Sequence, residues 1–219
     1  MHDSLQRLYS IKDRLIKGKS KFIISEYSRI NNFFDHLSVA AGFDVDLSDC
    51  IKLEKWQVYN FKNLYVPYSP AMLTNFTDST YPWLIRNYLK KFIDHNKPIP
   101  GLYLTRNHVI PGARGVLNES EVVEKLTNKG FVVVTGNESL KEIINLFYYA
   151  ECIVGAHGSL FANTIFSKPT CKVFEFCPHN RIDYSFKSKY KAVKEYMHLI
   201  VNGDVNFNID IQLDQLVIA

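Results

Sequence analysis

One stretch of the sequence, residues 151–166 (ECIVGAHGSLFANTIF), constrains the fold of this chain more than any other. It opens with an apolar run at residues 152–154, turns through residues 155–158 and continues as a helical pattern over residues 159–166. A strand, a glycine-flanked turn and a helix N-terminus in this order form an anion site in α/β proteins, because backbone N–H groups and the helix dipole favour negative charge there. An ordinary tight connection between a strand and a helix has the same pattern, so this stretch alone leaves both interpretations open.

Five residues of this stretch are candidates for contact with a ligand. Gly155 and Gly158 allow the backbone to approach a ligand closely or to adopt a positive φ. His157, between them, can donate a hydrogen bond to a phosphate or take up a proton, and the alternative is an ordinary surface histidine. Ser159 lies at the start of the helix, and Asn163, further along it, could hold the loop or lie at the surface.

The second half of the chain alternates apolar strands with helical patterns. We expect strands at residues 102–105, 131–135, 152–154, 172–176 and 196–201, and helices at 118–129, from 139 onward, at 158–167 and at 184–193. Asn118 with Glu121, and Ser139 with Glu142, form the pattern of two capping boxes, and Gly130 ends the first of these helices. Apolar strands alternating with helices predict a parallel sheet covered on both faces, which is a Rossmann-like α/β fold.

The first half shows a less regular pattern of the same kind. We expect helices at residues 4–17, 31–41 and 80–95, and strands at residues 21–25, 50–53 and 57–66. The stiff segment at residues 97–100 (KPIP) separates this part from the regular second half. We therefore predict two domains, at residues 1–97 and 98–219.

Polar side chains gather where the predicted strands end, which is where ligands bind in such sheets. These residues are Arg106, His108, Arg114, Glu175, His179, Asn180 and Arg181. Arginine forks match phosphate groups, and a carboxylate at a strand end suits the hydroxyls of a ribose. Together they predict a site for a nucleoside diphosphate.

Each of these residues also has a structural alternative. Arg106 and Arg114 could be solvated loop charges. Glu119 could simply favour the helix dipole from the first turn, and Glu121 could be only a cap partner. Glu175 is harder to dismiss, because a carboxylate in an apolar strand needs a partner.

Composition narrows the classes of partner. The net charge of +4 is too small for a nucleic-acid-binding surface but is compatible with a phosphorylated ligand. No apolar run approaches the roughly 20 residues of a membrane helix. The four cysteines form no C-x-x-C pair, which predicts reduced thiols, a reducing compartment and no zinc site. No G-x-G-x-x-G follows the first strand of either half, so a dinucleotide oxidoreductase is disfavoured.

The second half resembles glycosyltransferase family 61. The resemblance lies in Arg106 and Arg114 ahead of residues 118–121 (NESE), in residues 153–166, and in the glutamate of the segment 175–178 (EFCP). The family typically has arginines before an N-E-x-E helix, then a V-G-x-H-G-A-x-L-x-N-x-x-F segment, then a glutamate before a proline. Ser159 stands where the family usually has alanine.

The start of the chain, residues 2–8 (HDSLQRL), is similar to an N-terminal segment of the same family. The resemblance therefore implies a first domain that is reduced or truncated. It further implies a GT-B-like arrangement, with two Rossmann-like domains facing a cleft and the nucleotide sugar held mainly by the second. Such enzymes are similar to inverting transferases that need no metal and no cofactor, the nucleoside-diphosphate sugar being the donor substrate.

The resemblance also implies roles for individual residues. Arg106 and Arg114 would bind the diphosphate, with His157 and Gly158 at the helix-terminus cradle, and Glu175 would hold the ribose or the sugar. The general base stays open between Glu119, His157 and a residue of the first domain such as His2.

We therefore expect a glycosyltransferase that moves a sugar from a nucleotide sugar to a carbohydrate acceptor in surface polysaccharide assembly. The expected location is the cytoplasm, including the inner membrane surface, and a homodimer or a partner subunit stays open. Two alternatives are a GT-B-like sugar-nucleotide epimerase and a non-catalytic subunit that binds nucleotide sugars or acts as a scaffold.

Overall fold

The computed structural model describes residues 21, 23–25, 50–65, 92–94, 97–106, 114–184, 193, 195–212 and 214. The chain divides into two compact units, Met1–Lys91 and Phe92–Ala219. The predicted domain boundary after residue 97 stays a prediction. The helices expected at residues 4–17 and 31–41, most of those at 80–95 and 184–193, and the candidates His2 and His108 lie outside the described residues.

The described part of the first unit contains two short strands. Strand β1 (Ile23–Ser25) pairs in parallel with β2 (Ile51–Leu53). The strand predicted at residues 57–66 is wrong for residues 57–65, which form no strand. Trp56 and Val58 are 89% and 90% exposed. Apolar residues favour a strand when other parts of the protein pack against at least one of its faces. These side chains are exposed to solvent, so the segment lacks the packing that would stabilise a strand.

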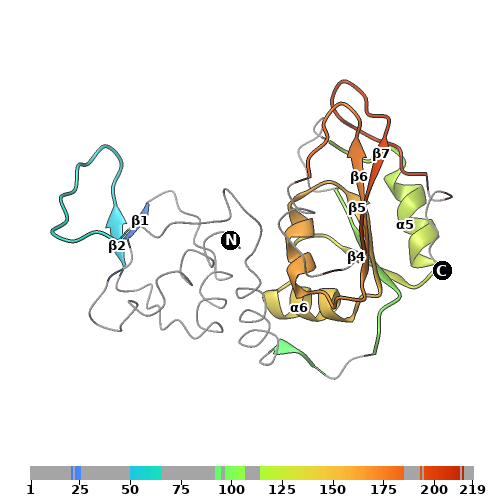
Figure 1. Cartoon of the computed structure of the whole chain (residues 1–219), viewed down its shortest axis with the longest axis horizontal. Helices are drawn as coiled ribbons and strands as arrows, with labels where there is room; N and C mark the ends of the chain where they lie inside the picture. Colours follow the sequence, from blue (N-terminus) through green and yellow to red (C-terminus); the bar gives the residue numbers. More distant parts are fainter. Residues whose placement is uncertain are drawn as a thin grey trace. The chain divides into compact units, whose positions relative to one another are not determined.

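The second unit is built on a five-stranded parallel sheet, as the apolar strands predict (Figure 1). Its strands are β3 (Gly101–Leu104), β4 (Phe131–Val134), β5 (Cys152–Ala156), β6 (Lys172–Pro178) and β7 (Glu195–Val201). They lie in the order β4-β3-β5-β6-β7, and all neighbours run parallel. Strand β4 was expected to be buried, but it lies at the edge of the sheet and Val132 is 38% exposed.

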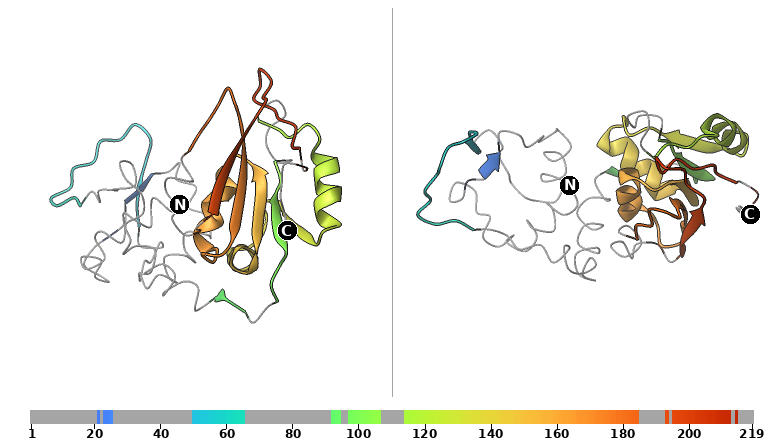
Figure 2. Two further views of the ribbon diagram at one scale, coloured as in Figure 1. Left: turned by 45° about the vertical axis from the view of Figure 1, so that its right-hand side comes forward. Right: turned by 90° about the horizontal axis from the view of Figure 1, so that it is seen from above.

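Helices cover both faces of this sheet, so the predicted α/β fold with a parallel sheet is confirmed, and it is consistent with a Rossmann-like fold (Figures 1 and 2). Helix α5 (Glu119–Thr127) packs on one face, and α6 (Leu140–Tyr149) and the 3₁₀ helix η5 (Ser159–Phe166) lie beside each other on the other. The larger GT-B arrangement of two such domains stays a prediction.

The apolar core on the α5 side joins the helix to the sheet and to the chain after β7. It comprises Tyr103, Val122, Leu126, Phe131, Val154, Phe174, Phe176, Ile209 and Ile211. Removing this apolar surface from water is the main source of stability for the sheet. The segment around residue 209 is thereby held close to the start of α5, which later places residues 203–208 beside the site.

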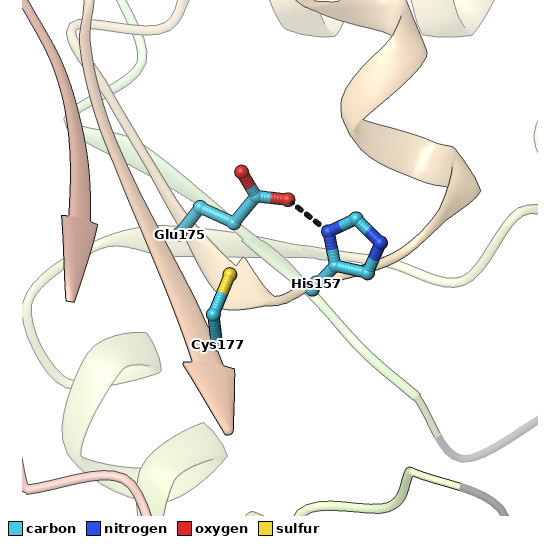
Figure 3. Close-up of side chains that lie close together, drawn as sticks. All are labelled: His157, Glu175 and Cys177. Atoms are coloured by element: carbon cyan, nitrogen blue, oxygen red, sulfur yellow. Dashed lines mark hydrogen bonds and ion pairs between the residues drawn. The ribbon is translucent and has the colours of Figure 1, made fainter. Parts of the chain in front are cut away.

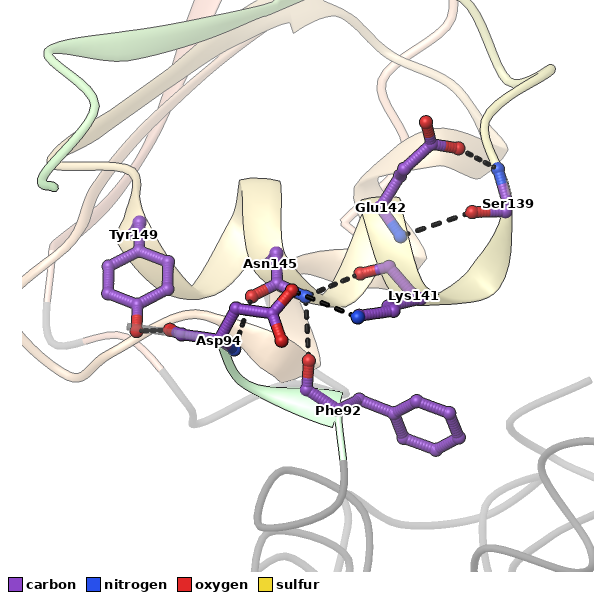
Figure 4. Close-up of polar contacts among 7 residues, drawn as sticks. All are labelled: Phe92, Asp94, Ser139, Lys141, Glu142, Asn145 and Tyr149. Atoms are coloured by element: carbon purple, nitrogen blue, oxygen red, sulfur yellow. Dashed lines mark hydrogen bonds and ion pairs between the residues drawn. The ribbon is translucent and has the colours of Figure 1, made fainter. Parts of the chain in front are cut away.

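Helix α6 begins at the predicted capping box. The Ser139 hydroxyl accepts from the backbone N–H of Glu142, and the Glu142 carboxylate accepts from the backbone N–H of Ser139 (Figure 4). The buried Asn145 then ties the helix to the segment before β3, accepting from Asp94 N at 2.9 Å and donating to the Phe92 carbonyl at 2.7 Å. Tyr149 also donates to the Asp94 carbonyl.

Helix α5 begins at the predicted residue but without the predicted capping box. The Asn118 side chain makes no cap hydrogen bond; it donates to the Ile211 carbonyl and accepts from the Ile211 N–H, both at 3.0 Å. Glu121 instead forms an i,i+4 ion pair with Lys125 at 2.6 Å. The Asn118 side chain therefore bonds to the segment after β7 and does not cap the helix. Gly130, with φ of 82°, follows the helix as expected.

The helix expected at residues 158–167 is η5, a 3₁₀ helix and not an α-helix. The backbone N–H groups of Phe161 and Ser167 donate to carbonyls three residues back, at 3.1 and 3.0 Å, which is the hydrogen-bond pattern of this tighter winding. Gly158 has φ of −178°, so the turn relies on close approach at its glycines and not on positive φ.

Candidate functional site

The site lies at the point in the sheet where the strand order reverses. The chain leaves β3 for β4 on one side and later places β5 on the other side of β3, so β3 and β5 flank a topological switch point. Ligands of open α/β sheets bind in the crevice at the carboxyl ends of such strands. Arg106 follows β3, and His157 and Gly158 follow β5, at this edge. A Cβ at Gly158 would lie 2.2 Å from Arg106 Nη1, so the two segments are in direct contact.

Arg106 is held in place from both ends. Its backbone N–H donates to Glu119 Oε1 at 2.8 Å, and its Nε donates to the carbonyl of Arg114 at 3.2 Å. Burial, and then the charge of Arg114, lower the pKa of the Arg106 guanidinium. Nη2 is buried and has no hydrogen-bond partner among the described residues. Two neighbouring guanidinium groups and a buried unused donor are what an anion would satisfy.

Glu119 anchors the end of β3 from the first turn of α5. Besides the Arg106 N–H, its Oε1 accepts from the hydroxyls of Tyr103 at 3.0 Å and Thr105 at 2.7 Å. Burial and the Glu119 carboxylate raise the pKa of Tyr103, so the phenol stays protonated and donates. Glu119 is 6% exposed. Its catalytic role stays a prediction, and its contacts favour a role in holding Arg106.

Arg114 adopts a left-handed backbone conformation, with φ of 56°, that is unusual for a residue other than glycine. Its N–H donates to the Asn206 carbonyl at 3.1 Å, and the N–H of Gly115 donates to Asn208 Oδ1 at 2.7 Å. Asp204 in turn accepts from the backbone N–H groups of Asn206 and Asn208 at 2.7 and 2.9 Å. The loop after β7 therefore fixes the backbone of Arg114 beside Arg106.

A small pocket lies between these segments. Its lining residues come from five places in the sequence: Arg114, Ala156, His157, Phe176, Pro178, Arg181, Phe207 and Ile209. Arg181 lies over the Phe207 ring, 5.2 Å from its centroid. The pocket therefore joins two guanidinium groups, an imidazole and an aromatic ring.

His157 is fixed by a fully buried carboxylate on β6 (Figure 3). Its Nδ1 lies 2.7 Å from Glu175 Oε1, and its Nε2 lies 3.5 Å from Asp183 Oδ2. The other oxygen of Glu175, Oε2, accepts from the Tyr196 hydroxyl at 2.9 Å and lies 2.9 Å from His198 Nε2. Glu175 is 0% exposed and His157 is 8% exposed. The pair is thus a buried carboxylate–imidazole dyad at the floor of the crevice.

The family profile described as Glycosyltransferase 61 matches residues 1–174. The chain belongs to the glycosyltransferase 61 family. The resemblance expected from the sequence is thereby confirmed, and membership makes the chain a glycosyltransferase, with a sugar and an acceptor as substrates. No curated protein matches the chain.

The remaining candidates of this glycosyltransferase 61 chain are spread around the crevice. Gly155 is buried within β5, where an added Cβ would lie 2.9 Å from the Leu104 carbonyl oxygen. Ser159 is exposed at the start of η5, and Asn163 is buried in it. Their roles in substrate binding stay predictions, and the position of Gly155 favours sheet packing.

Several residues that contact the dyad were not singled out from the sequence. Tyr196 and His198 alternate along β7, and His198 is the direct partner of Glu175 in the β6–β7 register. Asp183 lies in the connection after β6. A tyrosine and a histidine on the same face of an otherwise apolar strand (EYMHLIV) were the available signal, because such a face must pair its polar atoms.

Among the described residues, three possible metal ligands lie close together, although the sequence predicted no zinc site. One ligand atom each from His157, Glu175 and Cys177 lies within 4.8 Å of the others (Figure 3). Burial raises the pKa of the Cys177 thiol to about 12, so the thiolate that binds zinc is disfavoured. The 2.7 Å separation within the dyad suits a shared proton, since two ligands about 2.1 Å from one zinc ion in tetrahedral geometry stand further apart. These residues fit a hydrogen-bonded dyad better than a metal centre.

All four cysteines stand outside any disulfide, as predicted, and three of them are buried. The described part of this family member also contains no helix that is both long and apolar enough to cross a membrane. The predicted cytoplasmic location stays a prediction.

Proposed function

We propose that this chain transfers a sugar from a nucleoside-diphosphate donor to a carbohydrate acceptor, with inversion and without a metal ion. The observation that carries the proposal is the neighbouring pair Arg106 and Arg114 at the switch point, with a buried donor on Arg106 that has no hydrogen-bond partner among the described residues. Family membership supplies the reaction class, and this anion site supplies the reason to expect a phosphorylated donor.

The chemistry of the proposed reaction is a direct displacement. The acceptor oxygen forms a bond to the anomeric carbon, the bond from that carbon to the diphosphate oxygen breaks, and the diphosphate leaves with the electron pair. A general base takes the proton of the acceptor hydroxyl. Charge therefore develops on the diphosphate, where fixed guanidinium groups and N–H donors stabilise it without a metal ion.

His157 is better placed for the leaving group than for the acceptor. Inversion puts the base on the opposite side of the anomeric carbon from the diphosphate. His157 lies next to Gly158, which contacts Arg106, and it shares the pocket with Arg114. We therefore assign His157 to the diphosphate and place the base on the acceptor side. Glu119, whose Oε1 accepts three hydrogen bonds, becomes a residue that holds Arg106.

A thermal-shift titration tests the donor site. UDP, GDP and CMP are added with and without EDTA to the whole chain and to its Arg106→Ala and Arg114→Ala variants. A ligand that binds the native state raises the Tm. We expect one nucleotide to raise it equally with EDTA, and each variant to bind that nucleotide at least about 10-fold more weakly. Lys129→Ala removes an exposed charge after α5 and is the matched control.

Each outcome bears on the proposal. The absence of a shift with every nucleotide would contradict a donor site, and a shift abolished by EDTA would contradict metal independence. Binding without transfer to any offered glycan would favour the non-catalytic subunit, and turnover of a nucleotide sugar without acceptor would favour the epimerase.

A second comparison tests the role of His157. His157→Ala should weaken binding of the nucleoside diphosphate at least about 10-fold while changing binding of the matching nucleoside little, because only the former carries the phosphates. Normal diphosphate affinity with lost transfer would instead return His157 to the role of general base.

A further inference from the structure

Glu175 is an ionisable residue in the middle of the sheet, and the proposed donor site does not explain it. It is 0% exposed, and its neighbours in register are Gly155 on β5 and His198 on β7. Removing a carboxylate from water is costly unless hydrogen bonds and opposite charges surround it. A chain that retains a carboxylate here therefore gains something from it that an apolar residue would not provide.

The contacts of Glu175 point away from direct substrate binding. Its Oε1 is taken by His157 Nδ1 at 2.7 Å, and its Oε2 by the Tyr196 hydroxyl at 2.9 Å, with His198 Nε2 also at 2.9 Å. To hold a ribose or sugar hydroxyl it would have to give up one of these partners and reach solvent from the sheet interior. Of these three partners, His157 lines the pocket, and Tyr196 and His198 do not.

We propose that Glu175 is a positioning residue for sugar transfer, acting only through His157, whose Nδ1 it binds so that Nε2 is directed toward the pocket. This inference rests on the proposed contact between His157 and the donor diphosphate. A histidine ring whose Nδ1–H donates to a carboxylate has a fixed orientation and a fixed tautomer at that nitrogen. Nε2 is then the ring atom directed toward the ligand, and Asp183 Oδ2 lies 3.5 Å from it on a side chain that is about half exposed.

A double-mutant cycle separates action through His157 from independent action. Transfer rates of the whole chain are compared for wild type, Glu175→Gln, His157→Ala and the double variant, using the nucleotide sugar found in the titration. Glutamine has the shape of glutamate but lacks its charge. We expect Glu175→Gln to lower kcat about 10- to 100-fold and to weaken binding of the nucleoside diphosphate, as His157→Ala does, because the ring is misdirected. In the His157→Ala background the same change should alter kcat less than about 3-fold.

Tyr196→Phe is the matched control. It removes one hydrogen bond from Oε2 of the same buried carboxylate and leaves the Oε1–Nδ1 contact in place. We expect its kcat to stay within about 5-fold of wild type. A Tyr196→Phe effect as large as that of Glu175→Gln would indicate general damage to the buried network and would overturn the proposal.

The cycle also distinguishes failure of this inference from failure of the donor site. If His157→Ala impairs transfer and Glu175→Gln does not, the positioning role is overturned and the donor site stands. A Glu175→Gln effect that is undiminished in the His157→Ala background would show that Glu175 acts on the substrate itself. If neither variant alters transfer, the role of His157 in the proposed function is wrong as well.

A spectroscopic measurement covers the case in which Glu175→Gln is too unstable for kinetics. Spectra are recorded at low temperature on protein labelled with ¹⁵N-histidine. The signals of the His157 ring nitrogens are those that are missing from the spectrum of His157→Ala. We expect the Nδ1 signal of a ring bonded to a carboxylate in wild type and in Tyr196→Phe, and a shifted signal in Glu175→Gln. An unchanged His157 signal in Glu175→Gln would overturn the proposal.

Discussion

A single carboxylate oxygen organises the end of β3. Glu119 Oε1 accepts from Tyr103, Thr105 and the backbone of Arg106, and the first two of these residues are buried. The position of Arg106, which we assign to the donor, therefore depends on the position of Glu119. Glu119 links α5 to the site, although its Oε1 bonds to protein groups and not to the ligand.

Replacing Glu119 by alanine should therefore destabilise the protein severely. Three donors would lose their acceptor, two of them side chains with almost no access to water, and we expect a loss of about 3–5 kcal/mol in the free energy of unfolding. Urea unfolding of Glu119→Ala measures it. Glu121→Ala, on the same helix, removes only an exposed ion pair with Lys125 and should be indistinguishable from wild type. Equal stability of the two variants would contradict the anchoring role of Glu119.

The sequence singled out residues that the structure brings to the crevice, but not all of their partners. Arg106, His157 and Glu175 stand out because charged or titratable letters follow or interrupt apolar strands, and Glu119 stands out through the N-E-x-E pattern of the resemblance. Two partners of Glu175, Tyr196 and His198, in contrast, come from β7, about 20 residues further along the chain. Which side chains face one another across a sheet depends on strand order and register, which periodicity does not determine.

At the scale of elements, the turn after β5 shows two glycines with different roles. Gly158 has an extended φ that any residue can adopt, and its added Cβ would meet the flexible end of Arg106. Gly155 lies within the sheet, and its added Cβ would meet the backbone carbonyl of Leu104 at 2.9 Å. A side chain can move aside, whereas the backbone of a central strand cannot do so without disturbing the sheet.

Alanine at Gly158 should therefore weaken ligand binding, whereas alanine at Gly155 should lower the stability of the fold. Gly158→Ala should displace the Arg106 guanidinium and weaken nucleoside-diphosphate binding about 10-fold, with a Tm close to wild type. Gly155→Ala should lower the free energy of unfolding by about 1–3 kcal/mol through overpacking. Calorimetric titration and thermal unfolding of both variants measure the two effects. A Gly158→Ala protein with full nucleotide affinity would argue against Arg106 as a ligand.

The elements that the sequence predicted well are those in which local and tertiary preferences agree. The α6 capping box and the apolar strands of the sheet are of this kind. The capping box predicted for α5 is wrong because the Asn118 side chain bonds to Ile211, 93 residues away. The winding of η5 could not be read from eight residues, since periods of 3.0 and 3.6 differ little over so short a run.

At the scale of the whole molecule, the buried thiols affect the response of stability to pH. Burial raises the pKa of Cys152, Cys171 and Cys177 to about 12 each. In the unfolded chain such thiols ionise near pH 8.5. The folded state thus binds more protons above that pH. The stability linked to these thiols is fully present below about pH 8.5 and is lost as the pH rises toward 12.

We expect the free energy of unfolding to fall between about pH 9 and 11, with each thiol contributing a slope of up to about 1.4 kcal/mol per pH unit. Cys171→Ala should make the slope shallower by about that amount. Val173→Ala, a buried truncation at the adjacent strand that removes no titrating group, should lower stability without changing the slope. Urea unfolding at a series of pH values measures this, and equal slopes in the two variants would contradict the linkage.

The site itself is a property of the whole second unit. The family match ends at residue 174, yet Glu175, Arg181 and Phe207 lie beyond it and complete the crevice. The sequence placed Arg106, Arg114 and His157 together by the rule that ligands bind at strand ends. It could not place Phe207, because a loop after the last strand has no such rule.

The burial of Glu175 has an evolutionary consequence. Loop residues around a parallel sheet can change with little effect on the scaffold, so donor or acceptor preference can diverge there at low risk to folding. A residue in the sheet interior that also orients a pocket side chain has no such freedom. Every substitution at Glu175 is tested for stability and for activity at once, and variants that adjust one will usually be lost through the other. Divergence of specificity should therefore leave the dyad alone and proceed through pocket residues other than those assigned to the diphosphate, such as Phe207.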